Sequence, residues 1–186
     1  MTSAHVDTFA NDRLPPPEQQ PEYLFDLPEL QFPPQLNCAT ELLDRAIDKG
    51  WGERVCIQAP GVRWTYADLL AHANRIANVL VTDMGLVPGN RVLLRAPNNP
   101  MLVASWFAVM KAGGIAVATM PLLRAKEIRQ MVAKGEVTHA LCDMRLADDL
   151  RAAAAEPDCA MLRSIRYFNT APGGAPEQSL EAAMAR

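Results

Sequence analysis

The apolar residues of this chain change their spacing at regular intervals, from the period of a strand to that of a helix and back. Short apolar runs predict four strands, at residues 91–96, 115–119, 138–143 and 164–168. Amphipathic stretches predict helices between them, at residues 100–112, 125–134 and 146–155. Strands that alternate with helices in this way are typical of βαβ units. The sequence therefore predicts an α/β fold with a mostly parallel sheet.

A hairpin and a long helix are predicted ahead of that sheet. Residues 55–59 and 62–64 flank Pro60-Gly61, a turn dipeptide, and this pattern predicts two antiparallel strands. Thr65 and Asp68 have the spacing of a capping box, in which each side chain accepts a hydrogen bond from the backbone amide of the other residue. The helix that begins there is expected to end near Gly85.

Residues 1–36 are rich in proline and predict an extended arm, because proline lacks an amide donor and has a fixed φ. The arm also contains large apolar residues, namely Tyr23, Leu24, Phe25, Leu27, Leu30 and Phe32. We therefore expect it to lie across a surface of its own protein, with docking to another chain as the alternative. A helix should follow from Asn37, its cap, to Lys49, with an apolar face formed by Leu42, Leu43, Ala46 and Ile47.

Composition narrows the class of protein. The net charge of the 186 residues is −3, and their Lys and Arg residues are scattered, whereas nucleic-acid-binding proteins usually have a basic stripe. No apolar run approaches the ~18–20 residues of a membrane helix, and the first residues do not resemble a signal peptide. We therefore expect a cytoplasmic protein without nucleic-acid or membrane partners. The four cysteines lack metal-ligand spacing and are expected to be reduced and structural.

Motifs for phosphate binding or catalysis are missing from this sequence. It contains neither G-x-x-x-x-G-K-[ST] nor G-x-G-x-x-G after a strand, and Gly113-Gly114 lies at a predicted helix end, where carbonyl groups repel phosphate. His5, His72 and His139 form no set with a serine, cysteine or aspartate that could carry nucleophilic catalysis. The chemical step is therefore not expected within these residues.

Arg124 and Lys126 form the one suggestive cluster. They open a predicted helix just beyond the strand at 115–119, and ligands of open α/β sheets bind at the carboxyl ends of the strands. A guanidinium suits phosphate. The alternative interpretation is a solvated helix face that continues through Glu127, Arg129 and Lys134.

Several blocks of residues occur together in the order found in one enzyme family. They are Trp64-Thr65-Tyr66-Ala67-Asp68-Leu69, Ala73-Asn74-Arg75-Ile76-Ala77, Gly85 to Val92, Pro97-Asn98-Asn99-Pro100, and Phe107 to Gly114. This order and spacing, from residue 38 to about 145, resembles the adenylate-forming acyl-CoA synthetases. The proline-rich arm, Leu36-Asn37-Cys38-Ala39 and Ala118 to Arg124 resemble the aryl branch, above all the 2-aminobenzoate–CoA ligases.

The resemblance implies an acid–CoA ligase that uses ATP, CoA and Mg²⁺. In that family a carboxylate attacks the α-phosphate of ATP, and the CoA thiolate then displaces AMP from the acyl-adenylate. The chain would be roughly the first third of such an enzyme: an arm at 1–36, an α/β subdomain of the large domain at 37–170, and a linker with a short helix at 171–186. The phosphate loop should follow that linker, so the fragment alone is expected to be inactive.

The resemblance also assigns a role to Arg124, as a contact for the 3′-phosphate of CoA, with Lys126 in reserve. Asn90 stands where the family usually has aspartate, which removes one charge from a turn, and we expect little further consequence. A non-catalytic α/β binding or interaction module is the main alternative function, and a nucleotide-binding regulator is a weaker one. Homo-oligomer formation stays open.

Overall fold

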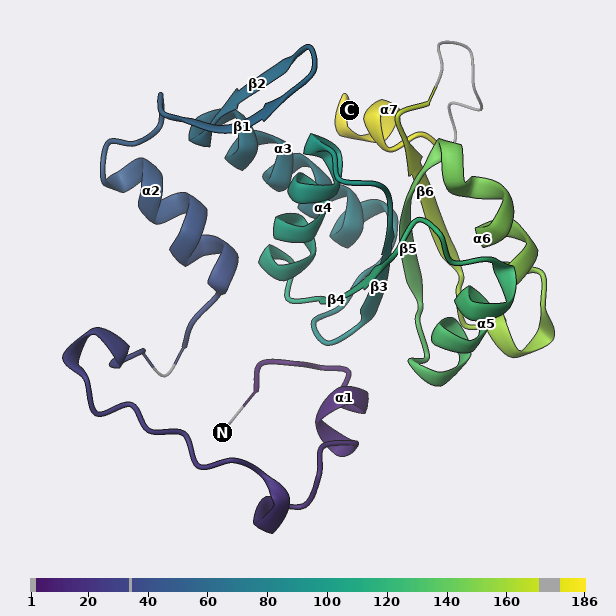
Figure 1. Ribbon diagram of the computed structural model, residues 1–186, viewed down its shortest axis with the longest axis horizontal. Helices are drawn as coiled ribbons and strands as arrows, with labels where there is room; N and C mark the ends of the chain where they lie inside the picture. Colours follow the sequence, from purple (N-terminus) through teal and green to yellow (C-terminus); the bar gives the residue numbers. More distant parts are fainter. Residues whose placement is uncertain (1–2, 34, 171–177) are drawn as a thin grey trace.

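The computed structural model describes residues 3–33, 35–170 and 178–186. Its centre is a four-stranded parallel sheet in the order β4-β3-β5-β6 (Figure 1). The strands are β3 (Arg91–Arg95), β4 (Ile115–Thr119), β5 (His139–Asp143) and β6 (Ser164–Phe168). Every residue of β3 and β5 is buried, as expected for the central strands of a parallel sheet covered on both faces. The predicted α/β fold is confirmed.

Helices cover both faces of this sheet. One face is covered by α3 (Tyr66–Asn78) and α4 (Pro100–Lys111), and the other by α5 (Ala125–Lys134) and α6 (Ala147–Ala154), as Figure 1 shows. Two apolar clusters follow from this layering, one around Ile76, Leu80 and Leu94 and one around Leu93, Ile128 and Leu150. The short α7 (Leu180–Met184) packs with the first cluster. None of the described helices is long and apolar enough to cross a membrane.

The predicted hairpin and capped helix are present. Strands β1 (Val55–Ala59) and β2 (Val62–Thr65) pair antiparallel, and Gly61 adopts the positive φ of +73° that the turn requires. At the start of α3, the amide of Asp68 donates to Thr65 Oγ1 at 3.2 Å and the amide of Thr65 donates to the Asp68 carboxylate at 2.9 Å. Helix α3 continues as a π-helical turn over Val79–Asp83.

The helix predicted from Asn37 also forms, although its middle is π-helical. Asn37 Oδ1 accepts from the amides of Ala39 and Thr40, and a π-helical segment at Thr40–Asp44 leads into α2 (Arg45–Asp48). The prediction that Leu42 belongs to the apolar face was wrong, because its side chain is 56% exposed. Leu42 lies inside the π-helical segment, where each turn holds more residues than an α-helical turn, so the α-helical spacing behind the prediction does not apply to it.

The arm differs from its prediction in two respects. It contains a short helix, α1 (Phe9–Asp12), which precedes the run of prolines. The large side chains expected to lie against the protein's own surface are instead solvent-exposed, at 40–67% for Tyr23, Leu24, Phe25, Leu27 and Phe32. Those aromatic rings contact one another: Tyr23 stacks on Phe25, which meets Phe32 edge to face. Local clustering of the aromatic rings therefore takes the place of the expected docking.

The start of the arm, by contrast, is anchored to the sheet. The amide of Asp7 donates to Pro88 O at 3.0 Å, and its carboxylate accepts from the Arg91 guanidinium, which is 4% exposed. The ring of Phe9 lies under the same guanidinium, 4.4 Å from its carbon to the ring centroid. These contacts lie at the amino end of β3, so α1 sits below the sheet in Figure 1, on the opposite edge from α7.

Asn90 has a larger role than its sequence context suggests. Its Nδ2 donates to Asp7 Oδ2 at 2.8 Å, while its Oδ1 accepts from the amide of Val87 at 3.1 Å. Burial raises the pKa of Asp7, but hydrogen bonds from Phe9, Arg91 and Asn90 outweigh it and leave the pKa below its usual value. An aspartate at position 90 would place a second carboxylate against Asp7. The expectation of little consequence was therefore wrong.

Candidate functional site at the carboxyl edge of the sheet

The strand order places a topological switch point between β3 and β5. After β3 the chain turns to α4 on one face of the sheet, whereas after β5 it turns to α6 on the other. The loops therefore diverge at the carboxyl ends of these two strands, and ligands of open α/β sheets bind in that crevice. Two charged residues end the strands there, Arg95 on β3 and Asp143 on β5, and both are 0% exposed.

Arg95 binds the backbone of two loops. Its Nε donates to Leu146 O at 3.2 Å, and its two terminal nitrogens donate to Met120 O at 3.3 Å, Pro121 O at 3.5 Å and Leu123 O at 2.8 Å. A buried guanidinium requires such acceptors, because its desolvation is otherwise costly. Arg95 thereby ties the loop after β4 to the loop after β5.

The predicted pair Arg124 and Lys126 lies on the far side of the first of these loops. Arg124 is the N-cap of α5, its side chain is 79% exposed, and its Nη1 is 3.4 Å from Asp149 Oδ2. Asp149 Oδ1 accepts from the amide of Ala125 at 3.2 Å. Lys126 is exposed, and among the described residues no carboxylate forms an ion pair with it. The structure thus places both cations at the carboxyl edge, one beside a carboxylate and one facing solvent.

Asp143 gathers a second set of residues at the same edge. Its carboxylate accepts from Asn99 Nδ2 at 3.1 Å, Asn169 Nδ2 at 2.8 Å, and the Arg145 guanidinium at 2.7 and 2.8 Å. Asn99 also caps α4, with Oδ1 accepting from the amide of Leu102. Burial raises the pKa of Asp143, but the hydrogen bonds from Arg145 and Asn169 outweigh burial and hold it below the usual value. Asp143 is therefore an ionised hub that joins the ends of β3, β5 and β6.

Sequence reasoning missed both Arg95 and Asp143. The available signal was a charged residue that ends an apolar run, after Val92-Leu93-Leu94 in one strand and after Leu141-Cys142 in the other. Charged residues are almost never fully buried unless they are paired. Their position at strand ends of an α/β fold therefore indicates an anchoring or binding role. Neither residue belongs to a nucleotide-binding motif.

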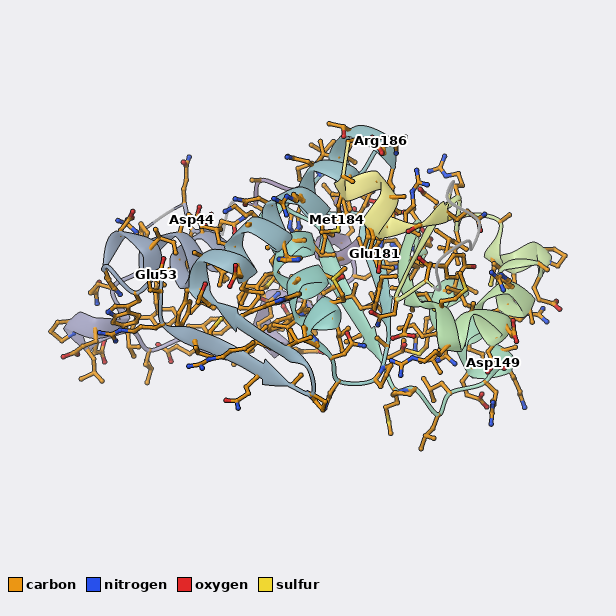
Figure 2. All side chains as sticks on the ribbon, turned by 90° about the horizontal axis from the view of Figure 1, so that it is seen from above. Asp44, Glu53, Asp149, Glu181, Met184 and Arg186 are labelled. Carbon is orange, nitrogen blue, oxygen red and sulfur yellow. The ribbon has the colours of Figure 1, made fainter. Side chains whose placement is uncertain are left out.

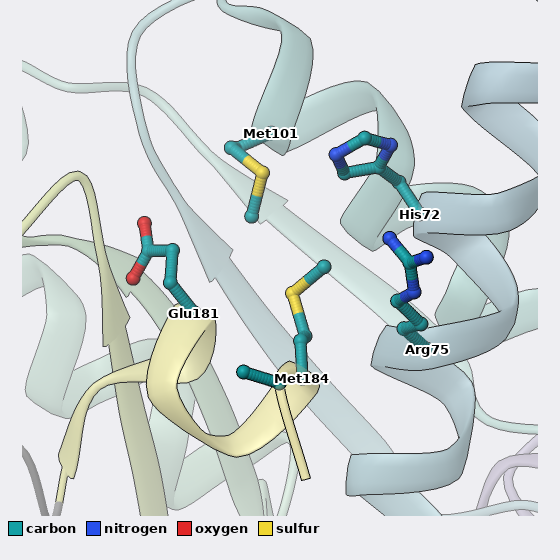
Figure 3. A pocket seen from close by; sticks show the side chains of 6 residues that line it. His72, Arg75, Met101, Glu181 and Met184 are labelled. Carbon is teal, nitrogen blue, oxygen red and sulfur yellow. The ribbon is translucent and has the colours of Figure 1, made fainter.

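A hollow of about 350 Å³ opens between α3, the start of α4 and α7. Figure 3 shows His72 and Arg75 on one side of it and Glu181 and Met184 on the other. His72 Nδ1 lies 2.8 Å from Asp68 O, and Glu181 Oε1 accepts from the amide of Asn169 at 2.6 Å. Both groups are thus engaged with backbone. Asp149 and Glu181 lie well apart in Figure 2, so the hollow is separate from the Arg124 loop.

Other titratable groups have structural roles. His139 is 5% exposed, with Nε2 3.0 Å from Met84 O and Nδ1 2.7 Å from the Thr138 hydroxyl. Burial lowers its pKa, which favours the neutral ring. All four cysteines are free, and burial raises the pKa of Cys142 to about 12, so this thiol stays protonated. In the part of the chain that the structure describes, no three His, Cys, Asp or Glu side chains gather into a metal site.

Comparison with known proteins identifies relatives. The family model described as "AMP-binding enzyme" matches residues 43–182, which is more than half of the chain. Triostin synthetase I of Streptomyces triostinicus is 37% identical over 105 residues, covering 56% of this chain and 20% of that protein. The 3-hydroxybenzoate–CoA/4-hydroxybenzoate–CoA ligase of Thauera aromatica is 30% identical over 104 residues, with the same coverages of 56% and 20%.

A solved structure shares the fold. The anthranilate CoA ligase AuaEII, crystallised in complex with anthranoyl-AMP, matches with a TM-score of 0.72 at 21% sequence identity, over 83% of this chain and 28% of that one. At that identity the match shows the fold alone. The chain spans 20% of the length of each of the two curated relatives, so what those whole proteins do extends well beyond these residues.

Proposed function

Because this chain belongs to the AMP-binding enzyme family, we propose that it is the amino-terminal part of an AMP-forming acid–CoA ligase. The match of the family model to residues 43–182 carries this proposal, together with a fold shared with the large domain of such enzymes. The whole ligase would activate a carboxylate with ATP and transfer the acyl group to CoA. The 186 residues alone would be inactive, because they contain no phosphate-loop motif.

The proposed substrate is an aromatic carboxylate, 2-aminobenzoate or a benzoate-like acid. The aryl-branch motifs from Ala118 to Arg124 support this choice, and a hydroxybenzoate–CoA ligase is among the relatives. We place the enzyme in the cytoplasm, without nucleic-acid or membrane partners.

Of the three cofactors that the family implies, namely ATP, CoA and Mg²⁺, the described residues fit only the 3′-phosphate of CoA. Arg124 and Lys126 are exposed cations at the carboxyl edge of a parallel sheet, which suits the 3′-phosphate of CoA. ATP would supply the activating phosphoryl group, and no residue here is assigned to it. Among the described residues no three His, Cys, Asp or Glu side chains gather, and none is assigned to Mg²⁺ either.

Pyrophosphate exchange tests the proposed function. The reading frame is sequenced past codon 186 and the protein that it encodes is expressed. This protein is assayed for exchange of labelled pyrophosphate into ATP in the presence of 2-aminobenzoate or benzoate, with acetate as the non-aromatic control. We expect exchange that depends on the aromatic acid, and none from the 186-residue chain. Exchange by the 186-residue chain would contradict the fragment assignment, whereas a preference for acetate would contradict the aromatic substrate.

Replacing Arg124 by alanine in the full-length enzyme is expected to raise the KM for CoA roughly tenfold and to leave the KM for dephospho-CoA nearly unchanged. A charge-assisted hydrogen bond contributes about 1.5–3 kcal/mol, and the 79% exposure of Arg124 puts its contribution at the low end of that range. Steady-state thioester formation with the two thiols measures this difference. The matched control is Arg129→Ala, which removes a cation of the same helix that is already paired with Asp158 and Glu156. Equal effects on both thiols would remove Arg124 from the phosphate site.

A further inference from the structure

We propose that Arg95 is a positioning residue, which holds the loop of residues 120–124 so that Arg124 and Lys126 face an incoming phosphate. That this phosphate belongs to CoA rests on the proposed function. That Arg95 holds the loop rests only on the hydrogen bonds between them. Arg95 does not contact solvent, so it acts only through the backbone and through Asp149.

The first part of the argument is the direction of the loop's backbone. The carbonyl groups of Met120, Pro121 and Leu123 all turn inward to the one guanidinium. Two side chains of this loop turn outward, since Met120 is 62% exposed and Leu122 is 78% exposed, whereas Leu123 packs against the cluster around Ile128. Arg124 follows directly in the chain, and its side chain is 79% exposed.

Arginine is the side chain best suited to this task. Its planar fork presents five donors at fixed angles, and here they satisfy carbonyl oxygens on two different loops. A lysine would bring a single ammonium group with three donors, and methionine would bring none. Because Arg95 also binds Leu146 O, the loop after β4 is fixed relative to α6 as well as to β3.

The second part of the argument is the charge around Asp149. Its Oδ2 lies 3.6 Å from a terminal nitrogen of Arg95 and 3.4 Å from Arg124, while Oδ1 accepts from the Ala125 amide. One carboxylate thus faces two guanidinium groups. Glu127 adds a second carboxylate, whose Oε2 accepts from the Arg124 amide at 3.0 Å, and Lys126 adds a third cation, so three positive side chains stand against two negative ones. Since exposed ion pairs contribute little, a phosphate can compete with Asp149 for Arg124. Without Arg95, Asp149 would neutralise Arg124 alone.

Limited proteolysis of the 186-residue chain tests the hold on the loop. In the Arg95→Met variant, we expect trypsin to cleave after Arg124 roughly tenfold faster than in the wild type, because the loop opens more often once its carbonyl groups lose their donor. Cleavage after Arg13 in the arm serves as the internal reference. Arg129→Met is the matched control, since it removes an arginine of α5 that makes no contact with the loop, and its cleavage after Arg124 should match the wild type.

Arg95→Lys and Asp149→Asn keep the test decisive if Arg95→Met does not fold. Lysine retains the charge and some donors, so it should give an intermediate cleavage rate. Asp149→Asn keeps an oxygen acceptor for the Ala125 amide and should leave the loop protected. An unchanged rate after Arg124 in the folded Arg95 variants would overturn the positioning role.

Thioester formation by the full-length enzyme separates this inference from the function on which it rests. If Arg95→Met raises the KM for CoA severalfold more than the KM for dephospho-CoA, with kcat little changed, the loop acts through the phosphate as proposed. If cleavage after Arg124 accelerates but both thiols are affected equally, the hold by Arg95 stands and the phosphate contact of Arg124 is overturned. Absence of any ligase activity in the wild type would instead refute the proposed function.

Discussion

Replacing Ile76 and Ile128 by alanine is expected to lower the free energy of unfolding by about 2–5 kcal/mol for each single variant and by about the sum for the double variant. Both side chains are 0% exposed, Ile76 in the cluster under α3 and α4 and Ile128 in the cluster under α5 and α6. The sheet separates the two clusters, so neither cavity can be filled by side chains that line the other. Urea denaturation of the four proteins, followed by circular dichroism, measures the three differences.

Exposed residues of the same helices provide the controls. Asn74→Ala on α3 and Gln130→Ala on α5 change solvent-exposed side chains and should alter the free energy of unfolding by no more than about 0.5 kcal/mol. The loss in free energy of unfolding of the double variant is compared with the sum of the two single losses. A departure of more than about 1 kcal/mol from that sum would show that the two clusters respond as one core.

Replacing Asp143 by alanine should lower the free energy of unfolding by about 1–3 kcal/mol, because the buried carboxylate is the shared acceptor of Asn99 and Asn169, which would lose these hydrogen bonds. Asp148→Ala is the matched control, since that carboxylate is fully exposed and only touches Arg151 at the surface. The control should change stability by at most about 0.5 kcal/mol. A comparable loss in both variants would contradict the role of Asp143 as a hub.

The pH dependence of the same hub has a defined sign. The folded chain holds the pKa of Asp143 below its usual value, so the unfolded chain binds a proton more readily. The contribution of Asp143 is therefore fully present above about pH 4 and is lost as the pH falls through the lower, folded value. Asp143→Asn cannot titrate, so its difference from the wild type should shrink as the pH falls below about 4. A difference that grows on acidification would contradict this assignment.

Much of the fold could be predicted because it depends on local patterns. The period of the apolar residues located the four strands and their helices, and the Thr65–Asp68 box formed as expected. The ordered motifs from Trp64 to Gly114 indicated a family that the match to residues 43–182 confirms. The predictions that failed, for Leu42, the arm and Asn90, concern the phase of an irregular helix or contacts with residues distant in sequence.

The candidate site was predicted only in part. Arg124 and Lys126 could be placed at the carboxyl edge because they follow a strand of a parallel sheet, and the structure places them there. The assignment of these residues to a phosphate stays a prediction. Arg95 and Asp143 could not be found in the same way, since their partners lie between 2 and 51 positions away and belong to loops with no motif of their own.

The sequence by itself determined the order of strands and helices along the chain, the capped start of α3 and the family, since each of these depends on residues that are neighbours in sequence. Tertiary structure decided which charges are buried, which loops meet at the switch point, and where the arm is anchored. Asp7 and Asn90 lie 83 positions apart, and their contact exists only because the amino end of β3 faces the start of the chain. The arrangement of strands in the sheet brings such residues together, and local periodicity carries no information about that arrangement.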